Sequence, residues 1–136
     1  MTTDDNKRII RRYYEEVWNT WNSVAAAEIL HPTLKFRGSL GVEVQGLDGF
    51  KDYVTLVRGA FPDFNNRIDA LIAEGDQVVV RLTYKGTHLG ELFGFAPTGR
   101  PVTYSGVAIF RIAGGKIVER WGLSDTHLLR KQLAGS

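Results

Sequence analysis

Cysteine is absent from the 136-residue chain, and its absence removes several classes of chemistry at once. Disulfides, thiol nucleophiles, iron–sulfur clusters and thiolate zinc sites are all excluded. The three histidines, His31, His88 and His127, lie in separate segments without the paired spacing of a metal site. A glycine-rich phosphate loop, a G-x-S-x-G elbow and an H-E-x-x-H pair are also missing. We therefore expect a protein that uses neither a metal nor an organic cofactor.

An excess of charge and long apolar runs are lacking too. Seventeen basic and fifteen acidic side chains give a formal charge of +2, which is too small an excess to indicate nucleic-acid binding. No apolar stretch approaches the roughly 20 residues of a membrane span, and the N-terminus lacks the cationic start and apolar run of a secretory signal. We expect a cytoplasmic protein that binds neither nucleic acid nor membrane.

The composition that remains is typical of one folded domain, with 43% hydrophobic and 24% charged residues. The length leaves no room for a second domain, so residues 1–136 are taken as one unit. Apolar residues at Ile10, Tyr14, Val17 and Trp21 predict a first helix that begins near residues 4–6. A short helix over 24–30, capped at 22 or 23 and stopped near Pro32, and a third over 48–59 follow. The glycine-punctuated segment 34–46 has room for a short strand or two.

After residue 62 the hydrophobic period changes from 3.6 to 2, which is typical of strands. Two hairpins are predicted, one around Glu74-Gly75-Asp76 and one from strands over 102–112 and 116–124, before a short C-terminal helix. The predicted fold class is α+β. A curved antiparallel sheet packed against the N-terminal helices would form a cone that encloses an apolar pocket.

The chain has more aromatic residues than a small core needs for packing. Each is a candidate for the pocket lining as well as for ordinary core packing. The candidates for binding a substrate are Tyr14, Trp18, Phe36, Phe50, Tyr53, Phe61, Phe93, Tyr104 and Trp121.

A carboxylate near the end of the last predicted strand is the main candidate for chemistry. Simple alternation places Ile117, Trp121 and Asp125 on one side of this strand, unless a bulge intervenes. If that side faces the pocket, desolvation would raise the pKa of Asp125 and make it a competent general base. Alternatively, Asp125 caps the C-terminal helix, which is an ordinary task for Asp at a strand–helix junction.

His88 is the second candidate, because it ends a predicted strand and enters the glycine-rich apolar loop 90–99. An imidazole there can donate to a substrate oxygen or transfer a proton near pH 7. The equally weighted alternative is a turn histidine that bonds to local backbone.

Six ordered pieces of the sequence resemble the SnoaL-like polyketide cyclase family. They are Leu30-His31-Pro32, GLDGFK at 46–51, AFPD at 60–63, GTHLG at 86–90, FAPTGR at 95–100, and the run from Phe110 through Trp121 to Asp125. The resemblance spans residues 7 to 133. It implies the cone-shaped fold shared with nuclear transport factor 2 and ketosteroid isomerase, and it implies a homodimer.

The resemblance also implies a reaction and roles for two residues. In such cyclases an aspartate near the end of the last strand deprotonates an activated carbon of a polyketide ester, and the enolate closes a ring by aldol addition without cofactor or metal. Asp125 matches that aspartate, which favours the base over the cap, and His88 matches a recurring histidine. Where those cyclases carry a pocket histidine on the penultimate strand, this chain has Ala108, which argues against an anthracycline-type substrate.

Three functions follow as hypotheses. The first is a cofactor-independent enzyme that cyclises or isomerises a small hydrophobic, polyketide-like carbonyl compound, with Asp125 as base and His88 orienting or protonating the oxygen. The second is a module that binds a hydrophobic ligand in the same pocket without transforming it. The third is a cofactor-free hydroxylase or hydratase of aromatic polyketides. An unpaired Asp125 beside Trp121 would favour the first hypothesis, whereas an Asp125 that pairs with Arg81 or caps the helix would favour the second.

Overall fold

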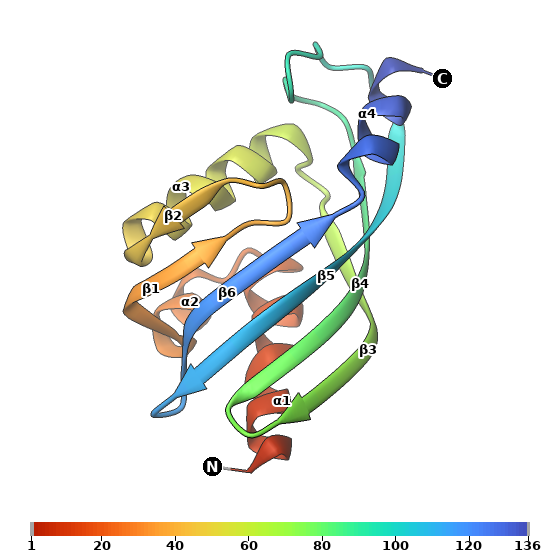
Figure 1. Cartoon of the computed structure of the whole chain (residues 1–136). Helices are drawn as coiled ribbons and strands as arrows, with labels where there is room; N and C mark the ends of the chain where they lie inside the picture. Colours follow the sequence, from red (N-terminus) through yellow and green to blue (C-terminus); the bar gives the residue numbers. More distant parts are fainter. Residues whose placement is uncertain (1, 136) are drawn as a thin grey trace.

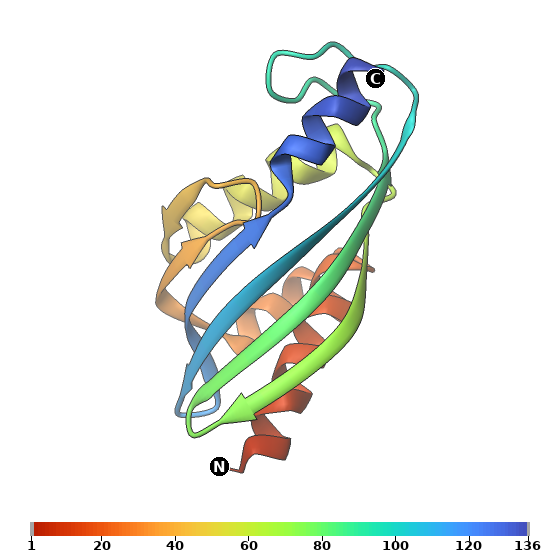
Figure 2. The same ribbon diagram turned by 45° about the vertical axis from the view of Figure 1, so that its right-hand side comes forward.

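A computed structural model describes residues 2–135 and shows one six-stranded sheet with the N-terminal helices across one face (Figure 1). The strands lie in the order β2-β1-β6-β5-β4-β3. Turning the molecule shows the long strands curving over those helices, and the sheet does not close into a barrel (Figure 2). The predicted α+β class is confirmed. The bounds are β1 Leu30–Arg37, β2 Glu43–Gln45, β3 Asn65–Glu74, β4 Gln77–Thr87, β5 Pro101–Ala113 and β6 Lys116–Ser124.

The N-terminal helical segment buries a cluster of large side chains. Helix α1 (Thr3–Arg12) begins earlier than predicted, because Thr2 rather than residues 4–6 forms the N-cap and completes a capping box with Asp5. It continues into a π-helical turn, η1 (Tyr13–Trp18). Tyr13, Tyr14, Val17 and Trp18 are all buried there, so the turn brings three aromatic rings to the inner face of the sheet.

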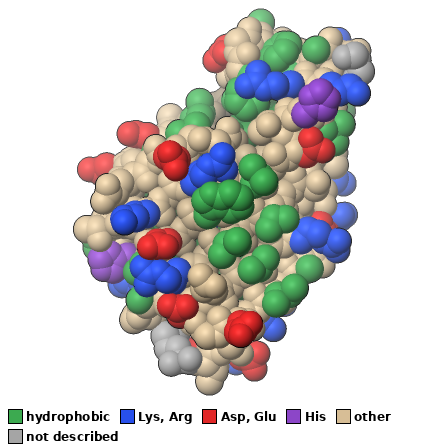
Figure 3. Space-filling model, viewed as in Figure 1, with side chains coloured by type: hydrophobic (Ala, Val, Ile, Leu, Met, Phe, Trp, Pro, Cys, Tyr) green, Lys and Arg blue, Asp and Glu red, His purple; other side chains and the backbone are tan. Residues whose placement is uncertain are grey.

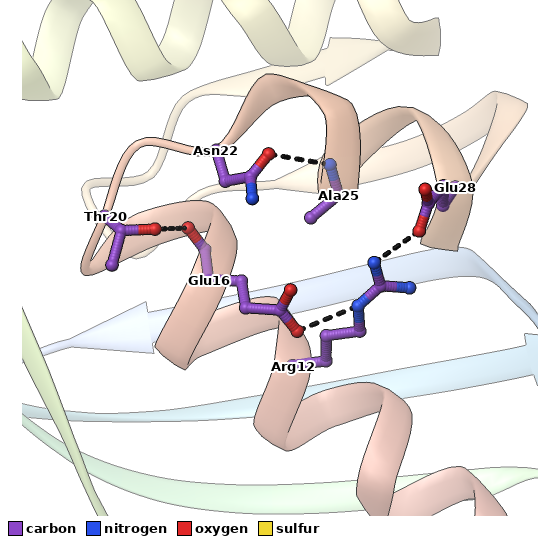
Figure 4. Close-up of polar contacts among 6 residues, drawn as sticks. All are labelled: Arg12, Glu16, Thr20, Asn22, Ala25 and Glu28. Carbon is purple, nitrogen blue, oxygen red and sulfur yellow. Dashed lines mark hydrogen bonds and ion pairs between the residues drawn. The ribbon is translucent and has the colours of Figure 1, made fainter.

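The second helix, α2 (Ser23–Ile29), is tied back to the first segment by polar contacts (Figure 4). Asn22 caps it by accepting from the Ala25 N–H at 3.0 Å, as predicted. Arg12 pairs with both Glu16 and Glu28 across the turn. Leu30 already has extended dihedrals and starts β1, so the predicted end of this helix at residue 30 is one residue late, and Pro32 lies within a strand.

Helix α3 (Gly46–Ala60) follows the short edge strand β2 and turns its buried face, including Phe50, Tyr53 and Val57, toward the sheet. Both predicted hairpins form, with β3 pairing β4 and β5 pairing β6 in antiparallel register. Strands β1 and β6 are parallel, so the sheet is mixed rather than antiparallel throughout. Helix α4 (Thr126–Ala134) packs against β5 near the end of the chain.

A bulge in β6 decides which of its side chains face the helices. Arg111 pairs with Glu119 and Ile112 pairs with Ile117, so Val118 is the extra residue. The prediction that Ile117 and Trp121 share one side is therefore wrong. Ile117 is fully buried, whereas Trp121 is 46% exposed on the outer face. Arg120 takes the inward position instead.

Among residues 2–135, no helix is long and apolar enough to cross a membrane.

Candidate functional site

The space between the curved sheet and the helices contains a small hollow. Its volume is about 10 Å³, which is about the space of one water molecule. A larger ligand can therefore enter only when lining side chains move. The lining residues are Tyr14, Trp18, Ser39, Leu40, Tyr53, Val57, Phe64, Asn66, Tyr84, Tyr104 and Arg120.

Arg120 is the one charged side chain in this lining, and only 5% of it is exposed. Its Nη1 donates to the carbonyl of Arg37 at 2.9 Å, and its Nη2 donates to the Ser39 hydroxyl at 2.9 Å and weakly to the Tyr14 hydroxyl at 3.4 Å. The guanidinium also lies over the rings of Phe36 and Phe110. Its Nε–H has no acceptor among residues 2–135. The polar end of the hollow is therefore a cation held by neutral groups.

Three tyrosine hydroxyls around Arg120, those of Tyr14, Tyr53 and Tyr104, keep their protons at neutral pH. Burial raises the pKa of Tyr14 and Tyr104 well above the usual value and that of Tyr53 to about 12. The Tyr53 hydroxyl accepts from the Leu40 N–H at 3.2 Å, and the Tyr84 and Ser39 hydroxyls are 2.6 Å apart. The hydroxyls of Tyr14, Tyr53 and Tyr104 are therefore neutral hydrogen-bonding groups, not bases.

Three glycines leave space for the polar side chains of the hollow. A Cβ at Gly122 would overlap the Arg120 guanidinium, and one at Gly38 would overlap the Tyr53 ring and hydroxyl. A Cβ at Gly106 would lie 2.7 Å from the Tyr84 ring. The side chains of Arg120, Tyr53 and Tyr84 can therefore take these positions only because glycine stands at one point on β6, in the segment after β1 and on β5, respectively.

The predicted binding aromatics fall into three groups. Tyr14, Trp18, Tyr53 and Tyr104 line the hollow. Phe36, Phe50 and Phe61 are buried behind that lining, in ring contacts with Tyr53, Trp18 and Phe64. The remaining two, Phe93 and Trp121, lie away from the hollow. Phe93 lies in the loop after β4 beneath the guanidinium of Arg130, and Trp121 lies on the outer face beneath Arg37.

His88 is fully buried at the end of β4, next to Phe61, and does not line the hollow. Its Nδ1 accepts from the Thr98 N–H at 3.2 Å and is 3.0 Å from the Thr98 hydroxyl. The neutral ring then carries its proton on Nε2, which has no partner among the described residues. His88 thus makes the local contacts of a turn histidine while keeping one unused donor.

Asp125 is exposed and lies between β6 and α4. Its Oδ1 accepts from the Leu128 N–H at 3.0 Å, so it caps α4. The cap uses one of the acceptor positions of the carboxylate. The neighbouring Ser124 hydroxyl donates to the carbonyl of Ser39, a lining residue, at 2.5 Å. Asp125 is therefore one residue from the rim of the hollow but outside it, and Arg81 lies exposed on β4 with no ion pair to it.

Three residues of the lining, Arg120, Ser39 and Tyr84, were not predicted from the sequence. Tyr84 alternates with Val80 and Leu82 on β4, a pattern that predicts the inward side. No comparable signal exists for Arg120, because only the bulge at Val118 turns it inward. In the part of the chain that the structure describes, no three His, Asp or Glu side chains group together as they would around a metal ion.

The family model described as "SnoaL-like polyketide cyclase" matches residues 8–133. An aklanonic acid methyl ester cyclase from Streptomyces galilaeus is 31% identical over 104 residues, which cover 75% of this chain and 72% of the relative. A second such cyclase, from Streptomyces peucetius, is 30% identical over 112 residues, covering 80% and 77%.

Solved structures agree in fold. AclR from Streptomyces galilaeus superposes with a TM-score of 0.85 at 27% identity, over 99% of this chain and 84% of that one. TsrD from Streptomyces laurentii superposes with a TM-score of 0.88 at 21% identity, over 100% of this chain and 99% of that one. At that identity the similarity shows the fold alone. Because the family model matches most of the chain, the chain belongs to the SnoaL-like polyketide cyclase family.

Proposed function

We propose that the chain is a cofactor-independent acid/base enzyme that forms an enolate from a small hydrophobic, polyketide-like carbonyl compound and cyclises or isomerises it. The observation that carries this proposal is the hollow, where apolar rings surround a few neutral hydroxyls and one cation within a chain of this family. Apolar walls with a few placed polar groups are typical of small-molecule sites.

The proton acceptor has to come from the rim, because the described lining residues include no carboxylate and no imidazole. Asp125 is the proposed base. Its carboxylate takes the proton of the activated carbon, and the electron pair of that C–H bond moves into the enolate. In a cyclisation the enolate carbon then bonds to a second carbonyl carbon, and the resulting alkoxide takes up a proton. His88 lies outside the lining of the hollow, and we propose that it orients or protonates that oxygen through its free Nε2–H once the lining side chains have moved to admit the ligand.

The second candidate is a module that binds a hydrophobic ligand without transforming it. The cap that Asp125 forms on α4, together with its exposure, favours this candidate. The two candidates share the hollow and differ in whether Asp125 receives a proton.

Asp125→Asn separates them. Asparagine keeps the shape of the side chain and can still cap the helix, but it cannot accept a proton at neutral pH. We expect exchange of the acidic carbon hydrogens of methyl 2-naphthoylacetate, followed by NMR in D₂O, to slow by roughly 10²–10⁴-fold in the variant. Its thermal unfolding and its affinity for the ester should change little.

Asp48→Asn is the matched control, since Asp48 is an exposed aspartate in the first turn of α3. Its exchange rate should equal that of the wild type. Unchanged exchange in a well-folded Asp125→Asn protein would remove Asp125 as the base, and a wild type that binds the ester without exchanging it would establish the binding module.

A further inference from the structure

The charge of Arg120 has no counter-ion. The five ion pairs among residues 2–135 do not include it. Burial works to lower the pKa of Arg120, but a guanidinium ordinarily loses its proton so far above neutral pH that the side chain stays charged. A buried cation without an anion is unfavourable for folding, because neutral partners replace only part of the lost hydration.

A purely structural clamp between β6 and β1 explains part of this arrangement. The two Nη atoms reach the Arg37 carbonyl and the Ser39 hydroxyl, which join the two strands. This role does not explain why Nε–H is left without an acceptor, nor why the side chain lines the hollow. A clamp does not need a positive charge, and this one leaves a donor of Arg120 unpaired. A ligand that supplies both a negative charge and an acceptor explains the arrangement better.

The rest of the lining suits an anionic ligand. Its polar groups are the hydroxyls of Ser39 and the tyrosines and the amide of Asn66, and the described part of it contributes no carboxylate that would repel an anion. The rings of Trp18 and Phe64 offer apolar contact for a hydrophobic body. A guanidinium donates strong, charge-assisted hydrogen bonds to an oxyanion.

We infer that the ligand of this hollow is a hydrophobic compound bearing an anionic oxygen, either a carboxylate or an ionised enol, and that Arg120 binds that oxygen. The inference rests on the proposed function in taking this ligand to be the substrate. In the enolate-forming reaction, the same contact places the cation where negative charge accumulates on oxygen.

Equilibrium binding of matched probes tests the inference without turnover. 2-Naphthoate and 2-naphthamide compare a carboxylate with a neutral amide of the same shape. 2-Hydroxy-1,4-naphthoquinone, ionised at neutral pH, and its 2-methoxy analogue make the same comparison for an enol. We expect at least one anion to bind the wild type 10-fold or more tightly than its neutral partner, and the responding pair identifies the oxygen type.

Arg120→Met keeps an apolar side chain of similar reach and should abolish this preference by weakening binding of the anion at least 10-fold. Arg111→Met is the control, because Arg111 lies on the neighbouring strand and pairs with Glu119 away from the hollow. Its preference should match that of the wild type. The Arg120 Nε–H signal in the NMR spectrum of the wild type gives a readout that needs no variant, and it should shift with the anion and not with the neutral probe.

Equal binding of anion and neutral partner in both pairs, no binding of any probe at millimolar concentration, an unmoved Nε–H signal, or a preference that survives Arg120→Met would each overturn the inference. Failure of the proposed function gives a different result, namely a protein that prefers the anion but has no exchange activity. A protein with exchange activity and no preference would retain the proposed function and lose the role given to Arg120.

Discussion

The buried hydroxyl of Tyr53 links the polar end of the hollow to the stability of the fold. It accepts from the Leu40 N–H and lies where a side chain on Gly38 would otherwise be. Burial raises its pKa from 10.0 to about 12, so the folded protein keeps this group neutral where the unfolded chain has already ionised it.

This shift predicts a loss of stability in alkaline solution. The contribution of Tyr53 is fully present below pH 10.0 and is lost as the pH rises through about 12, because the unfolded state releases the proton first. Urea unfolding between pH 8 and 12 should show the wild type losing stability with a steeper slope than Tyr53→Phe. The slopes are compared rather than absolute values, since the variant lacks the Leu40 hydrogen bond at every pH. Parallel slopes would contradict the assignment.

At the same scale, part of the lining of the hollow could be predicted from the sequence. Tyr14, Trp18, Tyr53 and Tyr104 were predicted as lining from their residue type and position, and they line the hollow. Arg120 could not be predicted, because its direction depends on one extra residue in β6 that leaves no mark in the hydrophobic pattern. Both roles considered for Asp125 follow from its place at a strand end. The cap is visible in the structure, and its role as a base stays a prediction.

The bulged strand β6 shows how an element, rather than a residue, forms the site. Its bulge turns Arg120 inward, and Gly122, two residues later on the same side, leaves the space that the guanidinium occupies. The guanidinium of Arg120 is therefore positioned by β6 itself and by the carbonyl of Arg37 on the parallel strand β1.

Gly122→Ala should displace Arg120 and destabilise the protein by about 1–3 kcal/mol, the usual cost of overpacking a filled interior. Chemical denaturation measures the loss. Gly59→Ala provides a control of opposite sign, because that glycine is in α3 with open space around its missing side chain and alanine favours a helix. A Gly122→Ala protein as stable as the wild type, with the Arg120 Nε–H signal unmoved, would show that the glycine does not position the guanidinium.

Element types were easier to predict than element partners. Periods of 3.6 and 2 and the turn residues around Gly75 and Gly114 predicted the helices and both hairpins. The parallel pairing of β1 with β6 had no such signal, because alternation records which face of a strand is buried and not which strand lies beside it. The end of α2 was misplaced because the extended backbone that precedes Pro32 already begins at Leu30.

On the scale of the whole molecule, the outer face of the sheet carries an apolar patch, visible near the centre of Figure 3. Val107 pairs with Leu123 and Ile109 with Trp121, so these four side chains are adjacent. Each is between 37% and 51% exposed. Contiguous apolar surface on a sheet face is a candidate for contact with another molecule.

We expect a second copy of the chain to cover this patch. Light scattering at micromolar concentration should then give twice the chain mass of 15.2 kDa. Ile109→Lys, which places a charge in the patch, should shift the mass toward the monomer. Val24→Lys should stay dimeric, because Val24 is 68% exposed on α2, away from the sheet's outer face. A monomeric wild type would refute the dimer.

We expect the chain's own side chains to perform carbon-acid chemistry. The most direct test uses wild-type protein dialysed against chelator, in D₂O, with methyl 2-naphthoylacetate and with aklanonic acid methyl ester, the compound in the names of the Streptomyces relatives. NMR follows deuterium entering the carbon between the carbonyl groups. We expect incorporation into at least one ester well above the buffer rate, unchanged by added metal. Incorporation into both esters at the buffer rate, or only after metal is added, would contradict it.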